Sequence, residues 1–315
     1  MTDQTMQTLR FHAYGAPADV LVLEDAAIPA PKAGHIRVRV RACGLNPADW
    51  ALCMGLFAGD LPRGVGLDIG GTVEAVGEGV TDVAVGDRVL GAAEFRDYPS
   101  AGASEHAILH AWAPVPEGLD LLQAAALPMA IETGYRCIDM LGVAAGQTVL
   151  VYSAGSVIGF AAVQMALMRG ARVIAAAGES LAADLRGFGA EVTPYGEGMV
   201  ERVRELAGGA PDLIFDGGPP SDVLPDLVKI AGGDAGRVLT VSNHGPKAEA
   251  LGVRNSFSLP RNDMLGPFAR LAAEGKFRIP IARSFPLADW REALAISLSG
   301  KAHGKLMLIP PGAEA

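Results

Sequence analysis

The feature that most constrains the fold is a strand, a loop and a helix that follow one another directly in the middle of the chain. Thr148–Tyr152 is a continuous apolar run with β-type residues, and Val157–Arg169 is an apolar segment of helical length. The run shows no alternation of polar and apolar residues, which is typical of a strand buried on both faces of a parallel sheet. The sequence therefore predicts an α/β unit here.

The same succession of strands and helices continues beyond this unit. Further strands are expected at Ala171–Ala176, Leu213–Phe215 and Arg237–Val241, separated by helices at Leu181–Phe188 and Val223–Ala231. Parallel strands need crossover connections, which are usually helices, so this alternation predicts a sheet covered on both sides. We expect this domain to comprise residues 122–267.

The first part of the chain has a different pattern. In His35–Ala42 every second residue is arginine or histidine and the others are apolar. Strict alternation is typical of an antiparallel strand with one solvated face. Short strands of this kind are also expected at Gly71–Val76, Arg88–Ala92 and His106–Leu109. A compact β-rich domain is therefore predicted for residues 1–121.

The last part of the chain returns to mixed elements. Helices are expected at Met264–Glu274 and Asp289–Leu298, and strands at Phe277–Ser284 and Lys305–Ile309.

Composition excludes several classes of protein. The chain has 315 residues, of which half are apolar, and a formal charge of −9 without any run of Lys or Arg. Nucleic acid and anionic membranes are therefore not expected as partners. The three cysteines (Cys43, Cys53 and Cys137) form no CxxC pair, and we expect neither a signal peptide nor a membrane span. A reduced, cytoplasmic protein with a small-molecule substrate is expected.

The loop after Thr148–Tyr152 is where a dinucleotide pyrophosphate binds in doubly wound sheets, against the N–H groups that begin the next helix. Instead of G-x-G-x-x-G the chain has Ala154-Gly155-Ser156-Val157-Ile158-Gly159, which keeps only the last glycine. Gly159 marks the close packing of helix and strand. Ser156 replaces the glycine at the closest approach to the pyrophosphate, so a bound anion would require its side chain turned aside and its N–H pointing at the anion. The motif alone leaves open both a dinucleotide site and an ordinary strand–turn–helix.

Several ordered motifs carry a resemblance to a known family over almost the whole chain. They are RACGLNPADW (41–50), GLDIGGTVEAVGEGVTDVAVGDRV (66–89), LPMAIETGYRC (127–137), VLVYSAGSVIGFAAVQMA (149–166) and GKFRIPIARSFPLADWREA (275–293). The chain resembles the medium-chain dehydrogenase/reductase superfamily, within the zinc-free quinone oxidoreductase and enoyl reductase group that includes zeta-crystallin. The resemblance implies an α/β fold in which a GroES-like catalytic domain (1–121 and 268–315) is interrupted by a Rossmann domain (122–267).

The resemblance also allows a test for zinc. Zinc-dependent relatives carry a ligand cysteine where this chain has Asn46, and a His-Glu pair where it has Leu67 and Asp68. Asn and Leu cannot complete a tetrahedral site of nitrogen and sulfur ligands. The pair His106/His110 is expected to flank a strand end rather than to bind metal, so no catalytic metal is predicted.

Catalytic roles follow from the resemblance residue by residue. It implies that Asn46 orients the nicotinamide carboxamide or polarises a substrate carbonyl, and that Thr133 hydrogen-bonds the nicotinamide end. Asp49 completes the first motif, either as a catalytic group or as a structural cap. Phe57 stands where several enoyl reductases have a tyrosine, so with Trp50, Met54 and Leu52 it suggests an apolar substrate pocket, although ordinary packing explains each of them equally well.

The expected cofactor is NADPH, with NADH as the alternative. The resemblance places phosphate contacts at Ser180 and Tyr195, but the basic residue usual there is missing, and Glu179 follows slightly after the position that contacts a ribose diol. The full set of expected cofactor-binding residues is Ala154, Gly155, Ser156, Val157, Ile158, Gly159, Ser180, Tyr195 and Ser242.

Two functions remain open at this level. The first is an NAD(P)H-dependent reductase of quinones or α,β-unsaturated carbonyl compounds, acting as a homodimer. The second is a descendant of the fold without redox chemistry, such as a cyclase, an isomerase or a small-molecule binding protein. Ser156, the absent phosphate clamp and Phe57 motivate the second.

Overall fold

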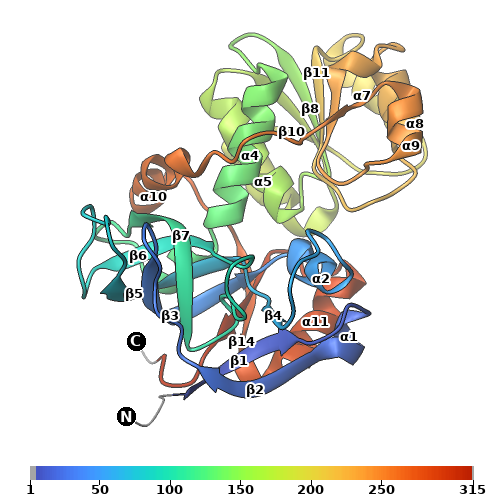
Figure 1. Cartoon of the computed structure of the whole chain (residues 1–315). Coiled ribbons are helices and arrows are strands. Elements are labelled where there is room, and N and C mark those ends of the chain that lie inside the picture. The colour runs from blue at the N-terminus through green and yellow to red at the C-terminus, as the bar shows by residue number, and fades with distance from the viewer. Residues whose placement is uncertain (1–4, 314–315) are drawn as a thin grey trace. The chain divides into compact units, whose positions relative to one another are not determined.

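The computed structural model in Figure 1 describes residues 5–313, so the outermost residues of the expected catalytic domain (1–4 and 314–315) lie outside it. The chain forms two compact units. One contains the described residues up to Met129 together with those from Asn262 onward, and the other is Ala130–Arg261. These boundaries differ from the expected 121/122 and 267/268. Helix α3 (Leu121–Ala125) packs on strands of the first unit, as does helix α10 (Leu265–Ala273).

The first unit is built on two sheets. A three-stranded sheet has the order β2-β1-β4, and a six-stranded sheet has the order β14-β15-β3-β5-β6-β7 with an additional β3–β7 pairing. The strands are β1 (Thr5–Phe11), β2 (Leu21–Ala27), β3 (Ile36–Leu45), β4 (Arg63–Gly64), β5 (Asp68–Val76), β6 (Arg88–Ala93), β7 (His106–Pro114), β14 (Ile281–Pro286) and β15 (Lys305–Ile309). The C-terminal strand β15 pairs antiparallel with β3, which joins both ends of the chain in one sheet.

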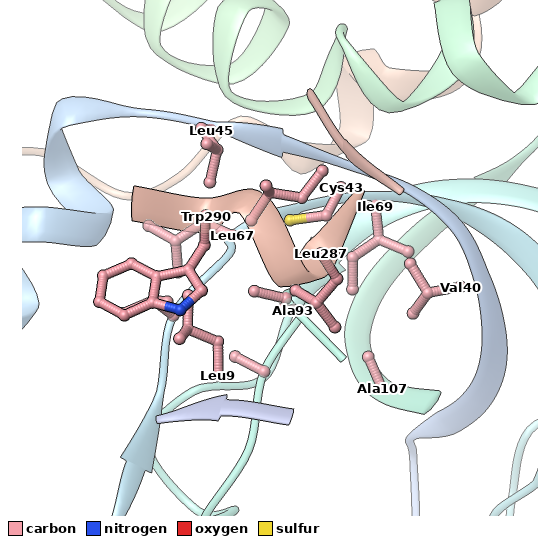
Figure 2. Packing of buried hydrophobic residues seen from close by; sticks show 14 of the residues in the cluster. Leu9, Val40, Cys43, Leu45, Leu67, Ile69, Ala93, Ala107, Leu287 and Trp290 are labelled. Atoms are coloured by element: carbon pink, nitrogen blue, oxygen red, sulfur yellow. The ribbon is translucent and has the colours of Figure 1, made fainter. Parts of the chain in front are cut away.

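The alternation seen in the sequence determines which face of β3 is buried. Ile36, Val38 and Val40 are fully buried, whereas the arginines between them are partly exposed. Figure 2 shows Trp290 and Leu287, from the C-terminal part of the chain, packed among residues of the first hundred such as Leu9, Cys43 and Leu67. Each large side chain removed from water contributes about 1.5–3 kcal/mol.

Short helices connect these strands. They are α1 (Pro17–Val20), α2 (Pro47–Cys53), α3, α10 and α11 (Trp290–Ser299). Helix α4 (Pro128–Leu141) begins at the end of the first unit and lies mostly in the second. Among residues 5–313, no helix is long and apolar enough to cross a membrane.

The second unit is a parallel six-stranded sheet of order β10-β9-β8-β11-β12-β13. Its strands are β8 (Thr148–Tyr152), β9 (Arg172–Ala176), β10 (Glu191–Thr193), β11 (Leu213–Asp216), β12 (Val238–Thr240) and β13 (Arg254–Asn255). Its further helices are α5 (Val157–Met168), α6 (Ala182–Phe188), α7 (Met199–Ala207), α8 (Leu224–Ile230) and α9 (Pro246–Leu251). The strand order reverses beside β8, which is the doubly wound arrangement and confirms the predicted fold class.

Two local predictions were wrong. The strand expected at Phe277–Ser284 runs instead over Ile281–Pro286, because Pro280 has no N–H for a strand ladder and its carbonyl accepts from the Lys305 N–H. His110 does not stand at a strand end, since β7 begins at His106 and continues through His110 to Pro114. The two histidines contact different carboxylates, Glu74 at 2.7 Å and Glu94 at 3.6 Å.

Candidate functional site

In the first unit the residues of interest surround the junction of β3 and α2. Asn46 lies between them in extended conformation, and its N–H donates to Oδ2 of Asp49 at 2.6 Å. The other carboxylate oxygen of Asp49 accepts from the Gly66 N–H at 2.8 Å. Asp49 therefore caps the start of α2 and fixes the neighbouring loop, which is the structural role considered for it. A catalytic role for Asp49 stays a prediction.

A buried lysine that the sequence analysis missed completes this cluster. The Nζ of Lys305, at the start of β15, donates to Oδ1 of Asn46 and to Oδ2 of Asp68, both at 2.6 Å. The Lys305 side chain is 0% exposed and that of Asp68 is 2% exposed. Asp68 also accepts from the Met129 N–H at 2.8 Å. A buried charge is tolerated only when it is paired and hydrogen-bonded, so these groups form one unit.

The cluster fixes the Asn46 carboxamide in one orientation. Its Oδ1 faces Lys305, and its Nδ2 donates to Asp68 Oδ2 at 3.0 Å and toward the Gly44 carbonyl at 3.5 Å. An amide held by a cation on one side and a carboxylate on the other cannot flip without breaking both contacts. The role of Asn46 toward a nicotinamide or a substrate carbonyl stays a prediction.

Burial dominates the electrostatics of this cluster. It raises the pKa of Asp49 to about 7, against hydrogen bonds from the Asn46 N–H that lower it, while the nearby Asp68 carboxylate raises it further. Burial likewise raises the pKa of the Cys43 thiol well above its usual range. The Asp49 carboxyl therefore titrates near neutral pH, whereas Cys43 stays a neutral thiol.

The residues expected to form an apolar pocket separate into two groups. Trp50 and Leu52 are buried members of the core, and the Trp50 indole N–H donates to Ser297 Oγ at 2.8 Å. Met54 and Phe57 are 63% and 50% exposed. Core packing, the alternative considered, therefore accounts for Trp50 and Leu52. The structure does not bring all four side chains together as the wall of one substrate pocket.

Thr133 lies on α4 in the second unit and is buried. Its hydroxyl donates to Oε2 of Glu132 at 2.8 Å. Glu132 also accepts from Arg136 at 2.5 Å and from the backbone N–H of Arg261 at 3.2 Å. A contact of Thr133 with a nicotinamide stays a prediction.

The loop after β8 has the close packing expected of a Rossmann loop. A Cβ on Gly159 would lie 2.2 Å from the Ser153 carbonyl oxygen and 2.9 Å from the Ala154 Cα, so only glycine fits. This confirms Gly159 as the point where helix and strand approach. By contrast, a Cβ on Gly155 or Gly178 would meet no atom within 4 Å. Open space therefore adjoins the loop and the end of β9.

Ser156 begins helix α5. Its Oγ accepts from the Gly159 N–H at 2.9 Å and donates to the Gly217 carbonyl at 2.8 Å. The Ser156 N–H donates to the Ser153 carbonyl at 2.9 Å, and its pointing at a bound anion stays a prediction. The turn uses that N–H itself. The first helical bond is made by the Phe160 N–H, so the N–H groups of Val157 and Ile158, which precede it, have no acceptor within the helix.

Two of the other predicted cofactor residues adjoin this loop region. The Tyr195 ring lies 5.3 Å from the Tyr152 ring, edge to face. Burial raises the pKa of the Tyr195 phenol, and its hydrogen bonds with the Ser153 side chain and the Gly155 backbone lower it. The Ser242 hydroxyl donates to the Gly218 carbonyl. Ser180 is exposed in a 3₁₀ turn after β9.

A buried network beside this loop was not predicted. Asp216 ends β11, and its Oδ2 accepts from Thr240 Oγ1 at 2.8 Å and from Asn243 Nδ2 at 2.7 Å. Its Oδ1 accepts from the Gly218 N–H at 3.1 Å. An aspartate between an apolar strand and two glycines was the available signal. The network fixes the loop that receives the hydroxyl of Ser156.

The donor atoms of the second unit fit a dinucleotide. N–H groups without an acceptor within the helix at the start of α5 suit a pyrophosphate, and the open space beside Gly155 and Gly178 admits it. A catalytic zinc fits the first unit less well, because Asn46 offers an amide that Lys305 already engages. Among residues 5–313, no three His, Cys, Asp or Glu side chains are grouped to hold a metal ion.

Comparison with known proteins identifies the family. Residues 32–113 match the alcohol dehydrogenase GroES-like domain, and residues 188–308 match the zinc-binding dehydrogenase family. The chain is 30% identical to the quinone oxidoreductase of Homo sapiens over 249 residues, which cover 76% of this chain and 74% of that protein.

Solved structures agree with this assignment. The quinone oxidoreductase from Coxiella burnetii is 27% identical with a TM-score of 0.82, covering 97% of this chain and 99% of that one. An NAD-dependent alcohol dehydrogenase is 28% identical with a TM-score of 0.83, covering 96% and 99%. The chain therefore belongs to the medium-chain dehydrogenase/reductase superfamily of nicotinamide-dependent oxidoreductases, among the relatives of quinone oxidoreductase.

Proposed function

We propose that this chain is a zinc-independent NAD(P)H oxidoreductase that transfers hydride to a quinone or an α,β-unsaturated carbonyl compound. The observation that carries the proposal is the loop after β8 in a chain related to quinone oxidoreductase. There Gly159 permits close helix packing, and the first N–H groups of α5 have no acceptor within the helix. A reduced nicotinamide, when bound, supplies the hydride, and the acceptor takes up a proton from solvent or from a protein group.

Residues of the second unit would hold the nucleotide. The N–H groups of Val157 and Ile158 would donate to the pyrophosphate, where the helix dipole also favours negative charge. Tyr195 and Ser242 lie on neighbouring loops and would border the same site, and Thr133 would contact the nicotinamide end. In the first unit, Asn46 with its fixed amide would orient the reacting groups.

Zinc independence is part of the proposal and rests on donor chemistry. The matched family is named for zinc binding, yet this chain has Asn46 and Leu67 where zinc-dependent relatives have ligands. The Lys305 ammonium already supplies a positive charge between Asn46 and Asp68. A metal ion there would have to displace it against electrostatic repulsion.

The assembly and the location are proposals too. We expect a homodimer, which the edge strand β13 supports, since an edge strand carries unpaired backbone groups and is followed here by the exposed Phe257 and Leu259. A cytoplasmic location is supported by the three free, buried cysteines. The family resemblance favours NADPH as donor through Ser180 and Tyr195, with NADH as the alternative.

The test is a direct assay of nucleotide oxidation. Purified protein with NADH or NADPH should oxidise the nucleotide, read at its nicotinamide absorbance, when 1,4-benzoquinone or a simple enone is added. The non-redox alternative is favoured by one observation, that the Ser156 hydroxyl spans to Gly217 where a glycine would leave room. Failure of both nucleotides to bind at millimolar concentration would favour that alternative and overturn the proposal.

A further inference from the structure

Backbone contacts of the second unit indicate which residues would face the adenosine of a nucleotide bound at the loop after β8. The Ala154 N–H donates to the Ala176 carbonyl at 2.9 Å, and the Ala177 N–H donates to the Thr193 carbonyl at 3.0 Å. The ends of β8, β9 and β10 therefore lie side by side. In doubly wound sheets the residues after the second strand face the adenosine ribose. Here those residues are Gly178, Glu179 and Ser180.

Carboxylates dominate this edge of the sheet. Glu179 is exposed three positions after the end of β9, and Glu197 is exposed in the loop after β10. A cavity of about 330 Å³ adjoins this loop, lined by Tyr152, Val223, Asp226 and residues 196–201, which include Glu197 and Glu201. A cavity of this size is at the lower end of the range for small-molecule sites.

Two cations on this side of the second unit, Arg202 and Lys229, are engaged by other groups. Residues 174–185 contain no Lys or Arg. Arg202, on α7 beside Tyr195, directs its guanidinium to four oxygens of its own loop. They are Thr193 Oγ1 at 3.3 Å and the carbonyls of Glu197 at 2.7 Å, Pro194 at 3.0 Å and Tyr195 at 3.4 Å. Lys229 pairs with Asp226 at 2.9 Å. A phosphate here would compete with these contacts.

From this we infer that the adenosine end of this site selects nucleotides with a free ribose 2′-hydroxyl, so that NADH binds in preference to NADPH. The inference rests on the proposed function and revises the NADPH preference suggested by family resemblance. A 2′-phosphate adds between one and two negative charges, which would face Glu179 and Glu197, with no Lys or Arg among residues 174–185 and with Arg202 held by its own loop. A ribose diol, in contrast, can donate hydrogen bonds to the Glu179 carboxylate.

The first experiment compares affinities without catalysis. Titration of nucleotide fluorescence at about 0.1 M salt should give a Kd for NADPH about tenfold or more above that for NADH. The ratio should shrink at 0.5 M salt because charge repulsion between exposed groups is screened. Equal or tighter binding of NADPH would overturn this inference while leaving the proposed function intact. If neither nucleotide binds, both are overturned.

Nucleotide fragments and protein variants test whether the preference for NADH arises at the adenosine end of the site. ADP should compete with NADH more strongly than adenosine 2′,5′-bisphosphate does. Glu179→Arg should lower the Kd for NADPH about tenfold and raise the Kd for NADH. Glu197→Gln should reduce the ratio of the NADPH Kd to the NADH Kd by about threefold. The matched control is Glu205→Gln, an exposed carboxylate in the last turn of α7, which should leave the ratio unchanged. An unchanged ratio in Glu179→Arg, or an equal change in Glu205→Gln, would contradict the inference.

Discussion

At the scale of single residues, the charge of Lys305 is confined by its two partners. The ammonium reaches Asp68 and Asn46 across 237 and 259 positions of sequence, and none of its side chain is exposed. Such a pair stabilises the fold only as a pair, because each member alone would be a buried charge without compensation. The cluster is therefore both a structural link between the ends of the chain and the holder of Asn46.

Replacing Lys305 alone should thus lower the free energy of unfolding more than replacing Lys305 and Asp68 together. Lys305→Met should lower the free energy of unfolding by about 3–5 kcal/mol, because Asp68 stays buried without its cation. The double variant Lys305→Met/Asp68→Asn should recover part of this loss. Urea unfolding of the four proteins of this cycle measures the coupling, and a simply additive double variant would contradict the pairing.

The raised pKa of Asp49 makes stability depend on pH. Its folded pKa of about 7 lies above the ordinary value of 3.8, so the folded state holds the proton more tightly. The contribution of protonated Asp49 to the free energy of unfolding is fully present below about pH 4. It is lost as the pH rises through 7. Asp49→Asn should flatten the slope of stability between pH 4 and 7, measured by denaturant unfolding. The same slope in both proteins would refute the assignment.

At the scale of elements, the start of α5 combines capping with room for a ligand. Gly155 and Gly159 are four residues apart, yet only Gly159 lies against backbone. Its contact with Ser153 fixes the angle at which the helix leaves the strand. Ser156 links this helix to the loop after β11 through one hydroxyl.

The two glycines form a matched pair of variants. Gly159→Ala should lower the free energy of unfolding by at least about 2 kcal/mol, because its Cβ would overlap the Ser153 carbonyl. Gly155→Ala should change it by less than about 1 kcal/mol, because its Cβ would meet open space. Thermal unfolding compares them directly. Equal losses would show that the loop differs from this structure.

Ser156→Gly separates stability from binding. The variant loses a helix cap and the bond to the Gly217 carbonyl, so its unfolding free energy should fall by about 1 kcal/mol. Nucleotide affinity should be kept or improved, since glycine restores room for the backbone to approach the pyrophosphate. A nucleotide titration measures the affinity and a thermal unfolding curve measures the stability, so the two expected changes are tested separately. A parallel loss of affinity would mean that the Ser156 hydroxyl itself binds the nucleotide.

At the scale of the whole molecule, one chain builds two units of different architecture, and the first is completed only by the last residues. Strand β15 pairs with β3 and carries Lys305 into the cluster around Asn46. The second unit is continuous in sequence and contains the expected set of cofactor-binding residues from Ala154 to Ser242. The catalytic residues proposed in the first unit and the cofactor-binding residues proposed in the second can therefore be tested by separate sets of variants.

The proposed zinc independence concerns the whole protein and can be measured on it. After dialysis against a chelator, the protein should retain the proposed quinone reductase activity, because Lys305 supplies the cation between Asn46 and Asp68. Elemental analysis should find less than stoichiometric zinc. A chelator-sensitive activity restored by added zinc would contradict the argument from Asn46 and Leu67.

The sequence by itself determined the periodic features of this protein. Alternation in β3, the apolar runs Val149–Tyr152 in β8 and Val173–Ala176 in β9, and the glycine at Gly159 each report local backbone geometry, and the structure confirms them. The strand Lys305–Ile309 was predicted with its bounds. Such patterns depend on neighbours within a few residues, so they can be interpreted without the fold.

Only the tertiary structure decided which side chains meet. Lys305 looked like one charged residue at the start of a strand, and its link to Asp68 and Asn46 depends on how β15 pairs with β3. Similarly, nothing near Arg202 in the sequence indicates that its guanidinium binds carbonyl oxygens of its own loop. Contacts between distant positions are set by packing and by burial of charge, and neither has a period along the chain.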